Sequence, residues 1–387
     1  MKKLPTWLEI DLDRLDDNLS SIRGYIGDVR LLLTVKADAY GHGAVQVAQA
    51  ARDRVDIFGV ATVDEAVELK EAGIENRILI LSPILETEIP QVIESGFAAT
   101  ISSFGIAQKV SEYASGHGKR ATVHVEIDTG MGRTGISEEY GREEVTKVSR
   151  LPNVHLEGVY THFPVSDTDV EYTIGQIERF ERLVDGLRAD GVEIPLVHSA
   201  NTGAVGLTEA HMDLVRPGLL AYGLHPTAAD DVGVEPIMSW KTRVVRVRRI
   251  PAGRSISYGR TFTTERDSLI GVIPVGYGHG YPFRSNGNGY VVVGGKRAPI
   301  VGRVTMDMTM VDLTDLDPAP HVGDEVVLVG RQAGESVTFH DVADWAGTIC
   351  YDVMCGISKR VPRTYFRKGK VETYKSLLGV IPNHVSV

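Results

Sequence analysis

Short apolar runs, spaced by amphipathic stretches, constrain the first part of this chain more than any other feature. Eight of them can be counted, at residues 30–35, 57–61, 77–81, 98–102, 122–127, 156–162, 195–199 and 212–216. Runs of strand length that alternate with helical patterns such as "VDEAVELKEAG" indicate βα units around a parallel sheet. Eight such units favour an α/β fold of the (β/α)8 type, a TIM barrel, over an open sheet.

The pattern changes after "GLHPTAADDVGVEP" at residues 223–236, which reads as a linker because of its Pro, Gly and Asp content. Short β-rich runs punctuated by Gly and Pro follow, as in an antiparallel β domain. We expect residues 1–235 to form the barrel and residues 236–387 to form a C-terminal, mostly β domain. The strand-like "WLEIDL" at residues 7–12 precedes the counted strands, so we expect it to pack outside the barrel, on the second domain.

Composition excludes several classes of function. The net charge is −10, and the one dense basic run, "KTRVVRVRRI" at residues 241–250, alternates with valines and predicts a strand with one solvated face, not a nucleic-acid interface. No segment is long and apolar enough to cross a bilayer. The two cysteines, Cys350 and Cys355, fit neither a disulfide framework nor a zinc site. We expect a cytoplasmic protein with no metal, nucleic-acid or membrane partner.

Chemically unusual residues fall where the barrel strands end. Lys36 directly follows the apolar run "LLLTV". A lysine in such apolar surroundings is costly unless it is paired or takes part in chemistry. His162 ends the sixth run, Arg133 lies in the loop "DTGMGRTG" after the fifth, and "SANTG" at residues 199–203 and Arg216 follow the last two. In this fold the carboxyl ends of the strands form the active face, and the last two loops often bind phosphate. A buried lysine facing a phosphate site could form a Schiff base with pyridoxal phosphate.

Longer motifs point to one family. They are "VKADAYGHG", "DTGMGRTG", "THF", "VRPG", "SYGRTF", "VGRVTMDMTMVD" and "GISKRVPR", in this order along the chain. Over nearly its whole length the chain resembles bacterial alanine racemases. That resemblance implies a fold-type III pyridoxal 5'-phosphate enzyme, a barrel followed by a β domain, and a homodimer whose active sites are shared between subunits. It also implies the interconversion of L- and D-alanine by a two-base mechanism on a pyridoxal phosphate aldimine, supplying D-alanine for peptidoglycan.

The resemblance assigns roles to individual residues. Lys36 matches the lysine that holds the cofactor and acts as one acid/base group, and Tyr258 matches the tyrosine that acts on the opposite face, contributed by the other subunit. Arg216 matches the arginine at the pyridine nitrogen, and His162 a histidine that links this region to the tyrosine. Further cofactor-binding positions are Tyr40, Asn201, Thr202, Gly218, Leu219 and Tyr351. Arg133 and Met306 match substrate-binding positions.

The chemistry agrees with these roles. Racemisation removes a proton from one face of a carbon and returns it to the other, so two bases on opposite sides suffice. Lysine and tyrosine both have unperturbed pKa values near 10, so we expect cationic neighbours, His162, Arg133 and Arg216, to depress them. An arginine stays protonated, so Arg216 would leave the ring nitrogen unprotonated and favour racemisation over transamination.

Three positions depart from the family pattern. Glu126 stands where some members carry a carbamylated lysine, and its carboxylate could orient Arg133 directly. His279 replaces a common acidic residue, and Thr305 replaces a frequent cysteine before Met306. Together with the entryway positions, these changes bear on substrate preference; the entryway positions are Asp167, Tyr277, Arg303 and Ile349.

Three alternatives stay open. A racemase of a larger or polar amino acid, such as serine, lysine or arginine, would use the same catalytic residues, although the bulky Tyr277 and Tyr351 favour a small side chain. A decarboxylase of the same fold type generally pairs an acidic residue with the pyridine nitrogen, which Arg216 argues against. A non-catalytic, single-barrel cofactor-binding protein would lack the β domain and Tyr258.

Overall fold

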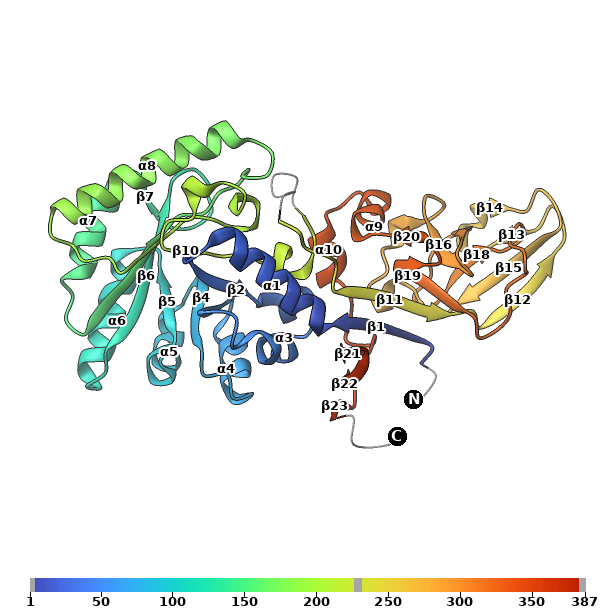
Figure 1. The fold of residues 1–387 in the computed structure, drawn as a ribbon, viewed down its shortest axis with the longest axis horizontal. Coiled ribbons are helices and arrows are strands. Elements are labelled where there is room, and N and C mark those ends of the chain that lie inside the picture. Colours follow the sequence, from blue (N-terminus) through green and yellow to red (C-terminus); the bar gives the residue numbers. More distant parts are fainter. Residues whose placement is uncertain (1–3, 226–231, 383–387) are drawn as a thin grey trace. The chain divides into compact units, whose positions relative to one another are not determined.

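The computed structural model describes residues 4–225 and 232–382 (Figure 1). Residues 226–231 of the expected linker lie outside the described part of the chain. The chain divides into two compact units. The barrel unit consists of Arg14–Ala39 and Ala44–Glu235, and the β unit consists of Met1–Asp13, Tyr40–Gly43 and Pro236–Val387.

Parallel strands of the barrel unit form a nearly closed barrel in the order β10-β2-β3-β4-β5-β6-β8-β9. Their bounds are β2 Arg30–Thr34, β3 Ile57–Val60, β4 Arg77–Pro83, β5 Ala98–Ile101, β6 Ala121–Asp128, β8 Val154–Tyr160, β9 Leu196–His198 and β10 Leu214–Val215. A parallel bridge between Asn201 and Arg216 joins the last two segments, and the short β7 (Ile136–Ser137) pairs with β6. The expected (β/α)8 barrel is confirmed.

Helices surround these strands (Figure 1). They are α1 Leu12–Ile26, α3 Ala44–Ala51, α4 Val63–Glu71, α5 Ile89–Ser95, α6 Phe104–Gly116, α7 Glu138–Ser149 and α8 Val170–Ala189. α4 shows why such segments are helical: Thr62 and Glu65 form a capping box, and Val63, Ala66 and Leu69 form one buried face at helical spacing. Apolar side chains from six strands pack as one cluster, made of Leu32, Ile57, Leu79, Ala98, Leu196 and Leu214.

The β unit is built on a sheet with the order β17-β16-β19-β11-β1-β21-β22-β23. Its strands are β1 Thr6–Asp11, β11 Met238–Arg243, β16 Tyr290–Val293, β17 Lys296–Pro299, β19 Glu325–Gln332, β21 Arg363–Arg367, β22 Lys370–Ser376 and β23 Gly379–Pro382, with β20 (Glu335–Val337) paired to β19. The N-terminal β1 lies between β11, antiparallel, and β21, parallel. The two helices α9 (Phe339–Ala346) and α10 (Cys350–Cys355) belong to the same unit.

A smaller sheet of the β unit contains β12 (Arg246–Ile250), β15 (Ser268–Ile273) and β18 (Thr309–Asp312). The basic run at residues 241–250 was expected to be one strand, which is wrong: it is divided between β11 and β12, in different sheets. The chain changes partners between them, because the Val244 N–H donates to the Asp324 carbonyl and the Val245 N–H to the Val272 carbonyl. Within the described residues, no helix is both long and apolar enough to span a membrane.

Candidate active site

Lys36 lies just beyond β2, at the start of a turn with unusual backbone geometry. The strand ends at Thr34, and Lys36 is half-buried where the sequence predicted a buried lysine at the strand end. The next four residues, Ala37 to Tyr40, have φ between 52° and 54°, the left-handed helical region. L-residues rarely adopt this conformation, which costs roughly 1–2 kcal/mol per residue. Such strain persists only where the surrounding structure determines it, and it occurs often at functional sites.

Two carboxylates hold this left-handed turn. Glu65 accepts the Ala37 N–H at 2.7 Å and, with its other oxygen, the Ala61 N–H at 2.7 Å. Asp38 accepts the Ala44 N–H at 2.8 Å, which joins the turn to the start of α3. The turn is therefore tied to the N-termini of two helices, and the position of the Lys36 backbone depends on both.

Replacing Ala37 by glycine should therefore not destabilise the protein. Glycine removes left-handed strain of roughly 1–2 kcal/mol and costs about 0.5–1 kcal/mol through the greater entropy of the unfolded chain. The matched control is Ala50→Gly in the right-handed α3, where a loss of about 1 kcal/mol is expected. Urea unfolding of both variants gives the two free energies. Equal destabilisation by the two changes would show that the turn is not strained.

Arg216 is buried at the mouth of the barrel, with 5% of its surface exposed. Its Nη2 donates to the Thr161 carbonyl at 2.9 Å and the Ser199 carbonyl at 3.0 Å, and its Nη1 donates to Nδ1 of His198 at 2.9 Å. Burial lowers the pKa of Arg216 to about 10, so the group is still a cation at neutral pH. Its Nε makes no hydrogen bond within the described residues.

His162 lies next to this arginine and is neutral. Its Nδ1 is 3.5 Å from Nη2 of Arg216. Burial, followed by the charges of Arg216, Arg133 and Lys36, lowers the pKa of His162 to about 3. The expectation that His162 contributes a positive charge is therefore wrong, because three cations and the loss of water oppose its protonation.

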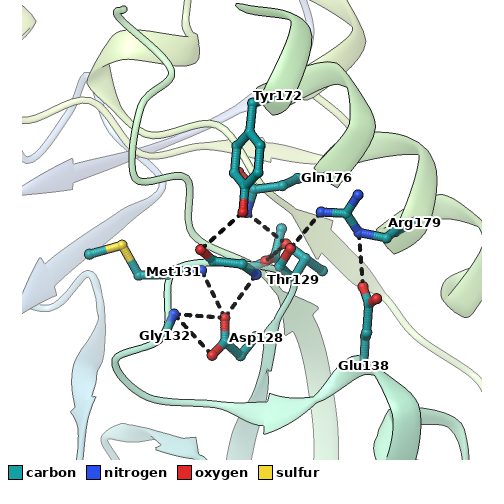
Figure 2. Close-up of polar contacts among 10 residues, drawn as sticks. Asp128, Thr129, Met131, Gly132, Glu138, Tyr172, Gln176 and Arg179 are labelled. Carbon is teal, nitrogen blue, oxygen red and sulfur yellow. Dashed lines mark hydrogen bonds and ion pairs between the residues drawn. The ribbon is translucent and has the colours of Figure 1, made fainter. Parts of the chain in front are cut away.

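The loop that carries Arg133 is folded around Asp128. The Asp128 carboxylate accepts the backbone N–H groups of Gly130 at 2.9 Å, Met131 at 2.8 Å and Gly132 at 3.0 Å (Figure 2). Gly130 also has φ of 142°, which side chains rarely adopt. This arrangement explains the aspartate and the glycines of the motif, and it leaves Arg133 exposed on the loop.

α8 holds the other side of the same loop (Figure 2). Gln176 donates to the Thr129 hydroxyl at 3.1 Å, and Arg179 donates to the Thr129 carbonyl at 2.8 Å and to Glu138 at 3.1 Å. Tyr172 reaches the loop from the preceding turn of α8, donating to the Gly130 carbonyl at 3.4 Å. Spacings of four and three residues place these side chains on one helical face.

Glu126 is buried beneath this loop, but it does not hold Arg133. Among the described residues no hydrogen bond or ion pair joins Glu126 to Arg133, although the charge of Arg133 does act on the Glu126 carboxyl. Glu126 is 3% exposed, and its Oε2 has no hydrogen-bond partner among the described groups. Burial raises the pKa of Glu126, although the Thr134 hydroxyl and the charges of Arg133 and Arg216 lower it in part.

The raised pKa of Glu126 predicts a pH-dependent stability difference. A carboxyl whose folded pKa lies above its unfolded value stabilises the fold below the unfolded pKa, and this contribution is lost as the pH rises through the folded pKa. Glu126→Gln should therefore match the parent protein in acid and become the more stable of the two as the pH rises toward neutral. Thermal unfolding across this range measures the difference, with the exposed Glu139→Gln as control. A difference that shrinks with rising pH would contradict the assignment.

At the barrel mouth, a short 3-10 helix is the first element after β9, and another is the first element after β10. The first, Thr202–Ala204, begins after Asn201, whose side chain accepts from Ser166 at 2.7 Å and from the Ala204 N–H at 3.2 Å. Asn201 also donates to the Phe163 carbonyl at 3.0 Å, so its amide is engaged by the protein. The second helix, Leu219–Tyr222, follows Gly218.

The backbone donors of these helices are only partly used. The Gly218 N–H donates to the Thr202 hydroxyl at 2.8 Å, so it is not available to a ligand in this structure. The N–H groups of Gly203, Leu219 and Leu220 make no hydrogen bond within the described residues. First-turn N–H groups lack intrahelical partners and suit an anion.

Tyr258 belongs to the β unit and lies in a strained turn. It begins the 3-10 helix Tyr258–Arg260, between β13 (Ser255–Ile256) and β14 (Phe262–Thr263), and it is 73% exposed. Ser257 and Arg260 have φ of 63° and 51°. The Ser257 hydroxyl donates to the Arg303 carbonyl at 2.7 Å, and this hydrogen bond joins the turn to the segment that carries Arg303. Residues with positive φ therefore flank Tyr258, just as four of them follow Lys36.

Met306 lies on an exposed loop of the same unit, and its N–H makes no hydrogen bond within the described residues. The loop is held by the Tyr277 N–H on the Thr305 carbonyl at 3.0 Å and the Gly278 N–H on the Met306 carbonyl at 2.8 Å. A Cβ at Gly276 would overlap the Thr305 carbonyl oxygen, so only glycine allows this approach. The hydroxyl of Thr305 closes the loop by donating to the Met308 carbonyl at 2.8 Å.

The remaining expected positions are divided between the units. Tyr40 and Tyr351 lie together in the β unit with ring centroids 5.8 Å apart, and burial followed by Tyr351 raises the pKa of Tyr40. His279 is also there, buried, and its Nδ1 accepts the Gly276 N–H at 3.3 Å. Of the expected entryway positions, Asp167 is an exposed residue of the barrel unit, and three belong to the β unit: Tyr277, Arg303 and Ile349.

Comparisons with known proteins agree with this geometry. Residues 10–226 match the model of the alanine racemase N-terminal domain, and residues 237–365 match that of the C-terminal domain. Alanine racemase 2 of Caldanaerobacter subterraneus subsp. tengcongensis is 42% identical over 385 residues, covering 97% of this chain and 98% of the relative. The chain belongs to the alanine racemase family. The members of this family are pyridoxal phosphate-dependent isomerases.

Solved structures of the alanine racemase family have the same fold. An alanine racemase of Clostridium difficile 630 superposes with a TM-score of 0.93 at 35% identity, covering 98% of this chain and 100% of that one. The alanine racemase of Bartonella henselae, solved with covalently bound pyridoxal phosphate, superposes with a TM-score of 0.87 at 26% identity, covering 94% of this chain and 100% of that one.

The barrel mouth fits the cofactor of the alanine racemase family. A pyridine nitrogen needs a donor, and the Nε of the buried Arg216 has no protein partner within the described residues. A phosphate needs several N–H groups, and those of Gly203, Leu219 and Leu220 are unengaged there. Lys36 supplies the amine that an aldehyde requires.

One group of buried polar residues inside the barrel was not predicted from the sequence. His124, Glu157, Tyr160 and His198 are all between 0% and 3% exposed, in a place where TIM barrels usually have branched apolar side chains. A signal was present, because each lies within a strand-like run: "TVHVEI", "LEGVYTH" or "PLVHS". A charged or imidazole side chain inside such a run is costly unless it is paired.

Proposed function

We propose that this member of the alanine racemase family interconverts L-alanine and D-alanine, with pyridoxal 5'-phosphate bound at the mouth of the barrel. The observation that carries the proposal is the buried Arg216, which is a cation at neutral pH and whose Nε makes no hydrogen bond within the described residues; its charge and that of Lys36 both act on His162. A cationic donor at a ring nitrogen suits racemisation because it does not protonate the ring.

Two residues of the chain would move the proton. When bound, pyridoxal phosphate supplies the electron sink that makes the α-hydrogen of an amino acid acidic. Lys36 would hold and move a proton at Nζ on one face of that carbon, and the hydroxyl of Tyr258 would do so on the other. The two residues differ in setting, since Lys36 is half-buried in the barrel unit and Tyr258 is exposed in the β unit.

Other residues would bind and orient. His162 is neutral, so it can accept from Arg216 without adding a charge to the site. Arg133, on the loop held by Asp128 and α8, would bind the substrate carboxylate by its charge. The N–H of Met306 would contribute a hydrogen bond to the same carboxylate, and the N–H groups at the barrel mouth would bind the phosphate.

We further propose a cytoplasmic homodimer in which Tyr258 of one subunit serves the Lys36 site of the other, and a role in supplying D-alanine for peptidoglycan. The proposal is consistent with the exposure of Tyr258, at 73%, because a tyrosine that acts on the substrate must be covered when the site is complete.

The test is incubation of the purified holoenzyme in D₂O with single L-amino acids, namely alanine, serine, lysine and arginine. Chiral chromatography with mass detection follows the products. We expect α-deuterated D-alanine to appear fastest, and the matched control Lys36→Ala to give none. Faster turnover of serine, lysine or arginine would show that alanine is not the preferred substrate. An amine product, or no exchange with the cofactor bound, would overturn the proposed function.

A further inference from the structure

Buried polar side chains inside the barrel form one continuous series of hydrogen bonds, here called the Glu157 network. Arg216 Nη1 lies 2.9 Å from His198 Nδ1, His198 Nε2 lies 2.9 Å from His124 Nδ1, and His124 Nε2 lies 3.0 Å from Glu157 Oε2. The other oxygen of Glu157 pairs with Arg77, whose side chain is 58% exposed. The network therefore joins the barrel mouth to the protein surface through residues of the barrel unit.

The direction of every bond in the Glu157 network is determined by its two ends. A guanidinium only donates, so Nδ1 of His198 must accept and the ring proton lies on Nε2. That Nε2–H donates to Nδ1 of His124, which by the same argument carries its proton on Nε2 and donates it to the Glu157 carboxylate. A protonated His198 would turn a donor toward Arg216, so both rings are neutral.

Electrostatics agree with this assignment. Burial, then Arg216 and His124, lower the pKa of His198 well below its usual value. Burial also lowers the pKa of His124, although Glu157 raises it in part. Burial acts against the charged form of Glu157, but the His124 hydrogen bond and the Arg77 charge lower its pKa overall. The network is thus two neutral rings between a cation and an anion.

The backbone of β8 is adapted to this arrangement. Val123 of β6 is paired with Leu156 and His124 with Gly158, so Glu157 is the extra residue of a β-bulge. Bulges re-aim a side chain, in this case toward the His124 ring. A Cβ at Gly158 would lie 2.7 Å from Cε1 of His124 and 3.0 Å from the Leu196 carbonyl oxygen, so the imidazole occupies space that only glycine leaves.

We propose that Glu157 is a positioning residue for the reaction at the barrel mouth: through His124 and His198 it sets the ring tautomers that keep a lone pair facing Arg216. The inference rests on the proposed function, in which Arg216 binds the ring nitrogen of the cofactor. Without the carboxylate, the proton of His124 can move to Nδ1. His198 must then accept there, its own proton faces the guanidinium, and Arg216 loses this acceptor.

The test compares three variants of the holoenzyme. Glu157→Leu removes the acceptor, Glu157→Gln keeps an oxygen in its place, and Thr100→Val removes a different buried hydrogen bond, the 3.0 Å contact with the Tyr160 hydroxyl. The readouts are ¹⁵N chemical shifts of the histidine rings, which report the protonated nitrogen, kcat and KM for alanine, and the melting temperature. The variants His124→Asn and His198→Asn assign the signals to the two rings.

We expect Nε2–H on both rings in the parent protein and in Glu157→Gln and Thr100→Val. Glu157→Leu should shift the tautomers and lower kcat by roughly 10- to 100-fold, as loss of an orienting partner does at metal-bound histidines, with a smaller change in KM. Rescue by glutamine separates positioning from mere stability. If the leucine variant does not fold, Gly158→Ala displaces the His124 ring without changing a titratable group and should give the same kcat loss.

Two results would overturn the inference: an Nδ1–H tautomer of His198 in the parent protein, or unchanged kcat and tautomers in a folded Glu157→Leu. The proposed function fails differently. A parent protein without alanine turnover would overturn that function, while its ring tautomers would still decide whether Glu157 controls them.

Discussion

Tyr258→Phe is expected to slow racemisation by roughly 10²–10⁴-fold, the usual contribution of a positioned acid or base. Phenylalanine keeps the ring and removes the hydroxyl, so one face of the substrate carbon loses its proton carrier. Lys36 still serves the other face. The variant should therefore exchange the α-hydrogen of one enantiomer of alanine with solvent, without inverting it.

Proton exchange measured by mass detection in D₂O, starting separately from L- and D-alanine, tests this asymmetry. Tyr140→Phe is the matched control, since Tyr140 is an exposed tyrosine of α7. Loss of its hydroxyl should leave the exchange rates of both enantiomers unchanged. Equal loss of exchange from both enantiomers in Tyr258→Phe would contradict a two-base mechanism.

Mixing two inactive variants should restore activity if the proposed homodimer shares its active sites. In a dimer of one Lys36→Ala subunit and one Tyr258→Phe subunit, one site carries both defects and the other carries none. A 1:1 mixture that re-associates at random gives half mixed dimers, so about a quarter of all sites are intact. We therefore expect about a quarter of the parent activity, from preparations that are each nearly inactive.

The measurement is the alanine racemisation rate after the two preparations are dissociated together and re-associated. A mixture of Lys36→Ala with parent protein serves as the control for recovery. No gain over the separate variants, with mixed dimers present, would mean that Lys36 and Tyr258 of the same subunit work together or that they do not share a site.

The fold could be predicted because it depends on local patterns that the chain repeats. Apolar runs mark the barrel strands, and caps such as Thr62 with Glu65 mark where helices begin. These signals arise between residues that are close in sequence, so they are readable without coordinates. Candidate catalytic and cofactor-binding residues could be predicted in the same way, since Lys36 and Arg216 lie at the ends of apolar runs.

Protonation and orientation could not be predicted in this way. His162 was expected to be a cation and is neutral, because Arg216, Arg133 and Lys36 converge on it from separate parts of the chain. Glu126 could have contacted Arg133 directly by its position in the motif, yet the hydrogen bonds that hold the Arg133 loop come from Asp128 and α8. Each outcome depends on which charges lie within a few ångströms of one another.

The sequence by itself determined the barrel, the β domain, the family and the identity of the chemical groups, since these depend on residue type and order. Tertiary structure alone decided the left-handed turn after Lys36, the neutral state of His162, and the network that joins Glu157 to Arg216. The physical reason is that electrostatic and hydrogen-bond energies depend on distance and burial. Glu157 and Arg216 are 59 positions apart in the chain, and only the closed barrel connects them through two buried rings.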